Sequence, residues 1–185
     1  KRKIYNTMLN WKKERNGDTA LLIQGARRVG KSTIAEEFAR NEYKSYILID
    51  FSKISKEVNE LFNDISDLNY LFIRLQFIFQ VKLHERESVI IFDEVQLQPK
   101  ARQAIKHLVK DHRYDYIETG SLISVRSKST NIIIPSEETK VDMFPMDYEE
   151  FRWALGDTAT IPLLRSVFEK KKDDARAREY RQIYR

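Results

Sequence analysis

The residues best suited to chemistry begin with a phosphate-binding pattern, G-x-x-x-x-G-K-S, at positions 25–32. An apolar run precedes it at 19–24 and a helix-like run follows at 32–41, the strand, loop and helix order that this pattern requires. Glycines let the backbone curl so that successive N–H groups point at phosphate oxygens, and the following helix adds the positive end of its dipole. The stretch therefore predicts a site for nucleotide phosphates.

Each residue of this loop has an expected part in binding. Lys31 is expected to reach the outer phosphates, which also makes it a catalytic candidate, and the Ser32 hydroxyl is expected to hold a magnesium ion. The side chains of Arg27 and Arg28 are expected to face solvent or a partner, because backbone N–H groups do the cradling. The predicted nucleotide-binding residues are Gly25, Ala26, Arg27, Arg28, Val29, Gly30, Lys31, Ser32 and Thr33.

A second pair of candidates, Asp93 and Glu94, follows the apolar run 88–92. In open parallel sheets the functional residues gather at the carboxyl ends of the strands. Asp93 is therefore expected to orient the magnesium, and Glu94 to polarise a water that attacks the γ-phosphate. A strand that merely ends in polar residues is the alternative, and the phosphate loop upstream argues against it.

Hydroxyl groups end the next predicted strand, at Thr119 and Ser121. They would lie close to the γ-phosphate and its attacking water, so we predict that they sense the phosphate and assist catalysis. A plain turn whose hydroxyls bond to backbone is the alternative. Arg126, just beyond, is a candidate arginine finger that would stabilise transition-state charge in its own or a neighbouring subunit.

Strand-like and helix-like segments alternate along the chain. Expected strands lie at 19–24, 46–51, 88–92, 114–119 and 140–144. Expected helices lie at 4–15, 32–41, 99–112, 148–155, 162–172 and 174–185, with two more between 55 and 83 that include a core helix at 70–81. Residues 122–139 are expected to form a functional loop or a hairpin, with a short edge strand at 131–134. Asp147 with Glu150 is typical of a capping box.

This alternation predicts an α/β fold, a three-layer sandwich around a mainly parallel five-stranded sheet in the order 5-1-4-3-2. Residues 1–160 are expected to form one ATPase domain with an N-terminal helix. Residues 161–185 are expected to be a C-terminal helical extension, the truncated start of a lid or of a following domain.

Composition narrows the function further. The chain has 185 residues, 42% of them apolar, which is ample for a buried core, and it has no cysteine for a disulfide or thiolate metal site. Its three histidines lack metal-ligand spacing, so we expect no zinc. Its longest apolar stretch, 70–81, is too short to span a bilayer, and we expect no membrane association and a cytoplasmic location.

Four motifs together resemble a known family: G-A-R-R-V-G-K-S, F-D-E-V-Q, E-T-G-S-L and M-F-P-M-D-Y-E-E-F. Over residues 1 to about 160 the chain looks like the P-loop ATPase domain, of ASCE/AAA type, in a bacterial and archaeal group that usually carries a C-terminal DUF4143 domain. The resemblance implies ATP and Mg²⁺ as ligands, with the ATP site at Gly25–Ser32, Asp93, Glu94, Thr119 and Ser121. The family's Gly-Arg pair after T-G-S has no clear match around Val125, Arg126 and Ser127.

The leading hypothesis is a magnesium-dependent ATPase that moves a protein partner and can form a homo-oligomer. A P-loop kinase acting on a small acceptor is a second enzymatic interpretation, and GTP is disfavoured because no N-K-x-D motif is present. The non-enzymatic alternative is a nucleotide-gated interaction module, with nucleic acid as a candidate partner. It depends on the net charge of +5 and on basic residues near both ends, which acidic residues interrupt toward the C-terminus.

Overall fold

The structure is a computed structural model of the whole chain, and it describes residues 2–121 and 137–173. Contacts divide the chain into two compact units. One is Lys3–Pro145, and the other combines Lys1–Arg2 with Met146–Arg185. The first unit holds the five described strands and the phosphate loop.

Five parallel strands form one sheet in the order β2-β3-β4-β1-β5. They are β1 (Ala20–Gly25), β2 (Ser45–Asp50), β3 (Ser88–Asp93), β4 (Asp115–Ser121) and β5 (Glu138–Met143). This is the predicted order read from the opposite edge, so the predicted fold class is confirmed. Because the strands run the same way, their carboxyl ends meet at one edge of the sheet, where the predicted site residues lie.

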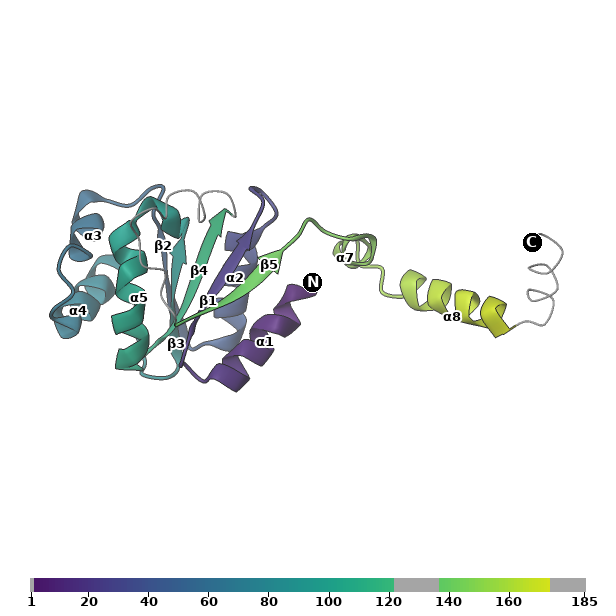
Figure 1. Cartoon of the computed structure of the whole chain (residues 1–185), viewed down its shortest axis with the longest axis horizontal. Helices are drawn as coiled ribbons and strands as arrows, with labels where there is room; N and C mark the ends of the chain where they lie inside the picture. The colour runs from purple at the N-terminus through teal and green to yellow at the C-terminus, as the bar shows by residue number, and fades with distance from the viewer. Residues whose placement is uncertain (1, 122–136, 174–185) are drawn as a thin grey trace. The chain divides into compact units, whose positions relative to one another are not determined.

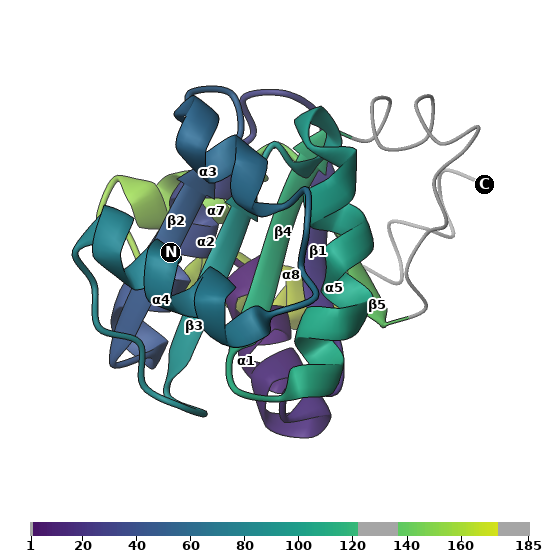
Figure 2. The same ribbon diagram turned by 90° about the vertical axis from the view of Figure 1, so that its left-hand side faces the viewer.

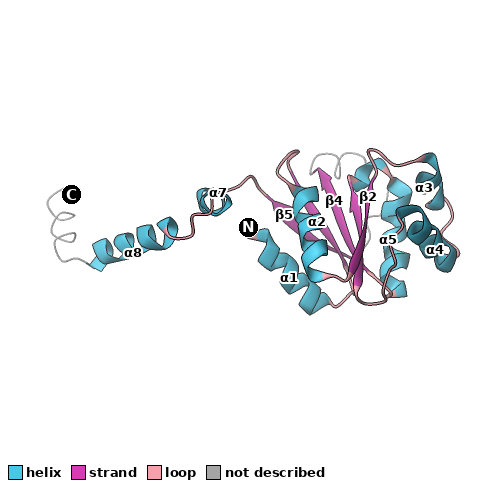
Figure 3. Ribbon diagram, turned by 180° about the vertical axis from the view of Figure 1, so that it is seen from behind, coloured by secondary structure: helices cyan, strands magenta, loops and turns pink. Residues whose placement is uncertain are grey.

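Helices cover both faces of the sheet and complete the three layers (Figures 1 and 3). The helices on one face are α1 (Ile4–Arg15) and α2 (Lys31–Glu42). Those on the other face are α3 (Lys56–Leu61), α4 (Leu68–Phe79) and α5 (Pro99–Asp111). Figure 2 shows these three in front of β2, β3 and β4. The sheet thus separates two apolar cores.

Helix α2 follows the phosphate loop because its apolar residues form one stripe. Ile34, Ala35, Phe38 and Ala39 are all buried against the sheet, as their spacing predicts. Burying such a stripe removes enough apolar surface from water to fix the helix on the sheet. The first turn of α2, which carries Lys31, is therefore held at the carboxyl end of β1.

Helix α4 differs from the core helix that was predicted at 70–81. One face packs into the apolar core through Leu71, Phe72 and Leu75. The other face is 57–65% exposed at three large side chains, Tyr70, Ile73 and Phe77. The prediction was wrong for this face because an apolar residue at almost every position does not reveal that α4 is the outermost helix on its side of the sheet.

The second unit contains α7 (Tyr148–Ala154) and α8 (Thr160–Asp173). The predicted capping box is confirmed, since the Asp147 side chain accepts from the Glu150 backbone N–H and the Glu150 side chain accepts from that of Asp147. The predicted helix at 174–185 and edge strand at 131–134 lie outside the described residues. Within the described part of the chain, no helix has both the length and the apolar character to cross a bilayer.

A buried ionic cluster lies under α5. Arg102 donates from Nε to Glu138 Oε1 at 3.1 Å and from Nη2 to Oε2 at 3.2 Å, and both side chains are almost fully buried. Glu118, on β4, is fully buried within hydrogen-bond reach of Glu138, and no N–H or O–H group of the described residues donates to it. Burial, and then the Glu138 charge, raise the Glu118 pKa well above its ordinary value. The fold therefore favours the protonated form of Glu118, in which its hydroxyl can donate to Glu138.

Replacing Glu118 with Gln should change how stability depends on pH. The pKa of Glu118 in the folded state lies above its unfolded value of about 4.3. The contribution of the bound proton to the free energy of unfolding is therefore complete below about pH 4.3 and is lost as the pH rises toward the folded-state pKa. The amide of Glu118→Gln can donate to Glu138 without titrating. Denaturant unfolding at pH 5 and pH 8 should show the variant gaining free energy of unfolding over wild type as the pH rises. Exposed Glu37→Gln should follow wild type, and an identical pH dependence in Glu118→Gln would contradict this assignment.

Candidate nucleotide site

The phosphate loop leaves the sheet at Gly25, the last residue of β1, and enters α2 at Lys31. Two of its residues have left-handed backbone angles, Arg28 with φ 65° and Gly30 with φ 93°. Such residues build the turns in which several N–H groups converge on an anion. A non-glycine residue in this region is strained, and strain of this kind is concentrated at functional sites.

Glycine is required at position 25 by close packing as well as by the loop. A Cβ at Gly25 would lie 2.1 Å from the backbone oxygen of Met143, on β5. A contact this short with backbone can be relieved only by moving the strand. The first residue of the phosphate pattern therefore also sets how closely β1 and β5 approach each other.

Lys31 folds back over its own loop. Its Nζ donates to the backbone oxygens of Ala26 at 2.8 Å and Gly25 at 3.3 Å, and only 5% of the residue is exposed. Burial lowers the Lys31 pKa below its ordinary value, and the carboxylates of Glu94 and then Asp93 oppose that shift. The ammonium thus lies near both carboxylates that were predicted to share its site.

The carboxylate of Asp93 connects three elements at the carboxyl edge of the sheet. Its Oδ1 accepts from Ser32 Oγ, on α2, at 2.6 Å and also from Thr119 Oγ1, on β4. Hydrogen bonds to an ionised acceptor are stronger than those between neutral groups. This one oxygen therefore holds the phosphate loop, β3 and β4 in a fixed arrangement.

Glu94 leaves the strand in a left-handed conformation, with φ 53° and ψ 45°. Its backbone N–H donates to Thr119 Oγ1 at 3.2 Å, so the Thr119 hydroxyl contacts both residues of the Asp-Glu pair. The Asp93 carboxylate accepts from a hydroxyl, whereas the Glu94 carboxylate accepts from the side-chain amide of Gln96, and both charges act on Lys31. Two adjacent carboxylates thus have different surroundings.

Ser121 lies beside Gly25 in the register of β4 and β1. The residue is buried, and its Oγ has no hydrogen-bond partner among the described residues. A buried hydroxyl without a partner costs free energy, and such a group calls for a specific explanation. A ligand bound at the phosphate loop, which begins at the neighbouring Gly25, would give this hydroxyl a hydrogen-bond partner.

Most of the predicted site residues meet at this edge. Those brought together are Gly25, Gly30, Lys31, Ser32, Asp93, Glu94, Thr119 and Ser121. Ala26, Arg27, Arg28 and Thr33 are exposed, and Val29 is half-buried. Arg126, the candidate arginine finger, lies outside the described residues.

One contact of the site was not predicted. Gln96, in the F-D-E-V-Q stretch, donates from its side-chain amide to Glu94 Oε2. The only indication of this contact in the sequence is that Gln96 follows Glu94 by two residues. The side chain of Gln96 is buried because the chain forms a short 3₁₀ turn here, η1 (Val95–Leu97). Such a turn is not marked by residue type.

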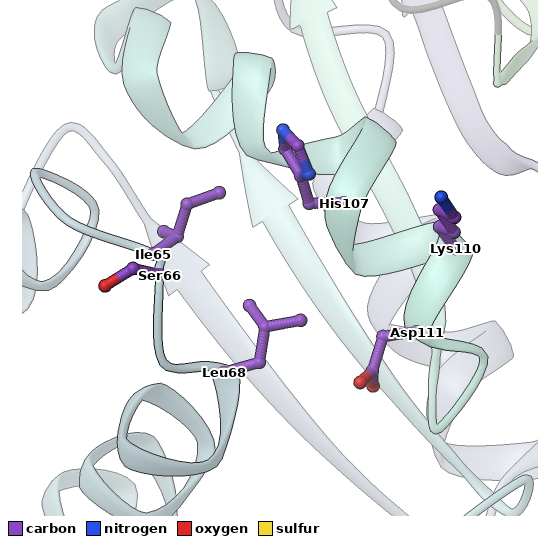
Figure 4. Close-up of a pocket in the computed structure, with 6 residues that line it drawn as sticks. All are labelled: Ile65, Ser66, Leu68, His107, Lys110 and Asp111. Carbon is purple, nitrogen blue, oxygen red and sulfur yellow. The ribbon is translucent and has the colours of Figure 1, made fainter.

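A separate hollow opens between α5 and the segment that precedes α4 (Figure 4). It has a volume of about 520 Å³ and is lined by Ile65, Ser66, Leu68, His107, Lys110 and Asp111. None of these residues belongs to the phosphate loop or to the carboxyl ends of β3 and β4. The hollow is therefore distinct from the candidate nucleotide site.

The sheet order and the strand, phosphate loop and helix at its carboxyl edge define a P-loop nucleoside triphosphatase fold. Residues 17–152 match the profile of a protein family described as an AAA domain. Since the match spans well over half of the chain, this protein belongs to the AAA domain family. It is an ATP-binding domain of AAA type.

Other comparisons add similarity but no function. A comparison with curated proteins gives no match. Among solved structures, a chain titled "Structure of C. elegans PCH-2" is similar with a TM-score of 0.42 and 16% sequence identity. The similarity covers 88% of this protein and 43% of that chain, so this protein spans less than half the length of that relative.

Replacing Thr119 with Val should destabilise the protein, because it removes the hydroxyl that donates to Asp93 and leaves the Glu94 N–H without its acceptor. The loss of a buried partner costs about 1–3 kcal/mol. Denaturant unfolding should show that loss for Thr119→Val, while Thr7→Val, at an exposed position on α1, should change the free energy of unfolding little. Equal stability of Thr119→Val and wild type would contradict the network around Asp93.

Proposed function

We propose that this protein hydrolyses ATP with magnesium and that Glu94 is the general base. The observation that carries the proposal is that the adjacent carboxylates of Asp93 and Glu94 have different hydrogen-bond partners. The Asp93 carboxylate is held by the hydroxyls of Ser32 and Thr119, whereas the Glu94 carboxylate accepts from the side-chain amide of Gln96 and its charge acts on Lys31. A carboxylate fixed at a hydroxyl suits a metal site, and one that lacks those hydroxyl partners but acts on the lysine of the phosphate loop suits proton transfer.

The donors present fit a magnesium nucleotide. Ser32 Oγ and Asp93 Oδ1 are 2.6 Å apart and both are oxygen donors, the type that Mg²⁺ prefers. The left-handed turns at Arg28 and Gly30 and the N-terminus of α2 suit phosphate oxygens. When bound, the ion would neutralise charge that develops on the phosphates. In the proposed site Ser32 and Asp93 hold the metal, and the loop from Gly25 to Thr33 holds the nucleotide.

In this proposal the residues of the site have different roles in binding and hydrolysis. Lys31 exchanges its bonds to the Ala26 and Gly25 oxygens for phosphate oxygens, which compensates the negative charge of the triphosphate. Glu94 takes a proton from the attacking water. Thr119, whose hydroxyl contacts the Asp93 carboxylate and the Glu94 backbone N–H, responds to the γ-phosphate, as does Ser121, whose hydroxyl has no partner among the described residues.

Thr119 also offers a route by which hydrolysis could move a partner. It lies on β4, whose continuation after Ser121 leads into residues 122–136. In our proposal a change at the γ-phosphate is transmitted through β4 to a protein partner or to a second copy of this chain in a homo-oligomer. Arg126 remains the candidate for an arginine finger in such an assembly, and residues 161–185 remain the candidate for a separate helical extension.

Glu94→Gln should bind ATP with wild-type affinity and lose turnover by about a hundredfold or more, because an amide cannot take the proton. The comparison requires calorimetric titration with ATP and measurement of phosphate release, with the exposed Glu37→Gln as the matched control. Unchanged phosphate release by Glu94→Gln would remove Glu94 from the mechanism. If the wild type binds ATP but releases no phosphate, the nucleotide-gated interaction module is supported instead. Turnover that needs an added small acceptor would support the kinase interpretation.

A further inference from the structure

Gln96 is a buried amide whose hydrogen bonds are only partly satisfied. Only 7% of the residue is exposed, and its Nε2 donates to Glu94 Oε2. Its Oε1 is fully buried and has no hydrogen-bond partner among the described residues. An amide oxygen can accept two hydrogen bonds, so Gln96 occupies its position at a cost in stability.

A neighbouring glutamine shows what a satisfied amide looks like in the same segment. Gln98 is 8% exposed and lies at the start of α5. Its Nε2 donates to the side chain and backbone oxygens of Asn59, and its Oε1 accepts from the Lys100 N–H at 3.3 Å. Gln98 therefore joins two elements and caps a helix, whereas the side chain of Gln96 bonds only to Glu94 among the described residues.

The backbone of Glu94 is already fixed without Gln96. Its N–H donates to Thr119 Oγ1, and its left-handed angles set the direction in which the side chain leaves. These backbone constraints do not fix the rotation of the Glu94 side chain or the direction in which each of its carboxylate oxygens faces. The amide of Gln96 binds Oε2 and so selects one orientation of the Glu94 carboxylate, with Oε1 outside this hydrogen bond.

From this geometry we propose that Gln96 is a positioning residue that holds the Glu94 carboxylate in the orientation that accepts a proton from the attacking water. This inference rests on the proposed hydrolysis of ATP. In the step, the water oxygen bonds to the γ-phosphorus while the bond from that phosphorus to the bridging oxygen breaks. The water proton passes to Glu94, and ADP leaves with the electron pair of the broken bond. Gln96 gains and loses no proton.

The unsatisfied amide makes this role separable from a structural one. If Gln96 served stability, replacing it with an apolar residue of similar size would lower the melting temperature. If it orients Glu94, the same replacement removes a buried orphan oxygen and should leave the melting temperature unchanged or raise it, while catalysis falls. Stability and turnover are therefore expected to move independently.

The test compares Gln96→Leu with Gln98→Leu, which makes the same chemical change at an equally buried position two residues away. For Gln96→Leu we expect kcat to fall roughly tenfold or more, with the affinity for ATP within about twofold of wild type. Gln98→Leu should lower the melting temperature and leave kcat close to wild type. A Gln96→Leu variant with wild-type kcat, or one whose KM alone rises, would overturn the proposal.

A second measurement does not depend on turnover. ADP with aluminium fluoride mimics the transferring phosphate, and its affinity can be measured by calorimetry for wild type, Gln96→Leu, Glu94→Ala and the double variant. We expect Gln96→Leu to weaken binding in the wild-type background and to have no further effect when Glu94 is Ala. Equal effects in both backgrounds would show that Gln96 does not act through Glu94.

These two readouts separate the failure of the inference from the failure of the proposed function. Absence of phosphate release by the wild type, or full activity of Glu94→Gln, overturns ATP hydrolysis with Glu94 as base. The four-variant cycle still decides whether Gln96 orients Glu94. A coupled cycle supports the positioning role, and an additive cycle contradicts it.

Discussion

The arrangement of the site depends on one carboxylate oxygen, Oδ1 of Asp93, which accepts hydroxyl groups from Ser32 and Thr119. Ser32 belongs to the first turn of α2 and Thr119 to β4, so this oxygen joins the phosphate loop to two neighbouring strands. A buried carboxylate is costly unless donors compensate its charge. The two hydroxyls supply that compensation, and they place the groups that phosphate chemistry needs within contact of one another.

The rest of the larger unit can be understood as support for that contact. Parallel strands place the ends of β1, β3 and β4 at one edge, and the apolar stripe of α2 holds its first turn against the sheet. Gly25 lets β1 approach β5 to a distance that no side chain would permit. Helix α5 buries Arg102 and two glutamates beneath it, a polar cluster on the face opposite to α2.

Much of this arrangement could be predicted from the sequence, because local patterns carried the required physics. The phosphate pattern between a strand and a helix located the loop, and the Asp-Glu pair after an apolar run located the opposite wall of the site. Together with the alternation of elements, these signals predicted the order of the five strands, which the structure confirms. The roles of the individual site residues remain predictions.

Other features depend on contacts between segments that are distant in the sequence. The pairing of Arg102 with Glu138 requires α5 to lie over β5, and no local pattern indicates it. The exposed face of α4 arises because no other described helix of the larger unit covers it. Gln96 reaches Glu94 through a 3₁₀ turn, and neither residue type nor periodicity reveals that its amide is buried.

The most direct test of the account is the affinity for ATP with and without magnesium in wild type, Ser32→Ala and Asp93→Asn. The pair formed by the Ser32 hydroxyl and the Asp93 carboxylate is the proposed metal site, so wild type should bind ATP more tightly when magnesium is present. Both variants, once shown by thermal unfolding to be folded, should lose that gain while keeping the affinity measured without the ion. If either variant keeps the full magnesium-dependent gain, the assignment of the Asp93 contact as the centre of the nucleotide site is wrong.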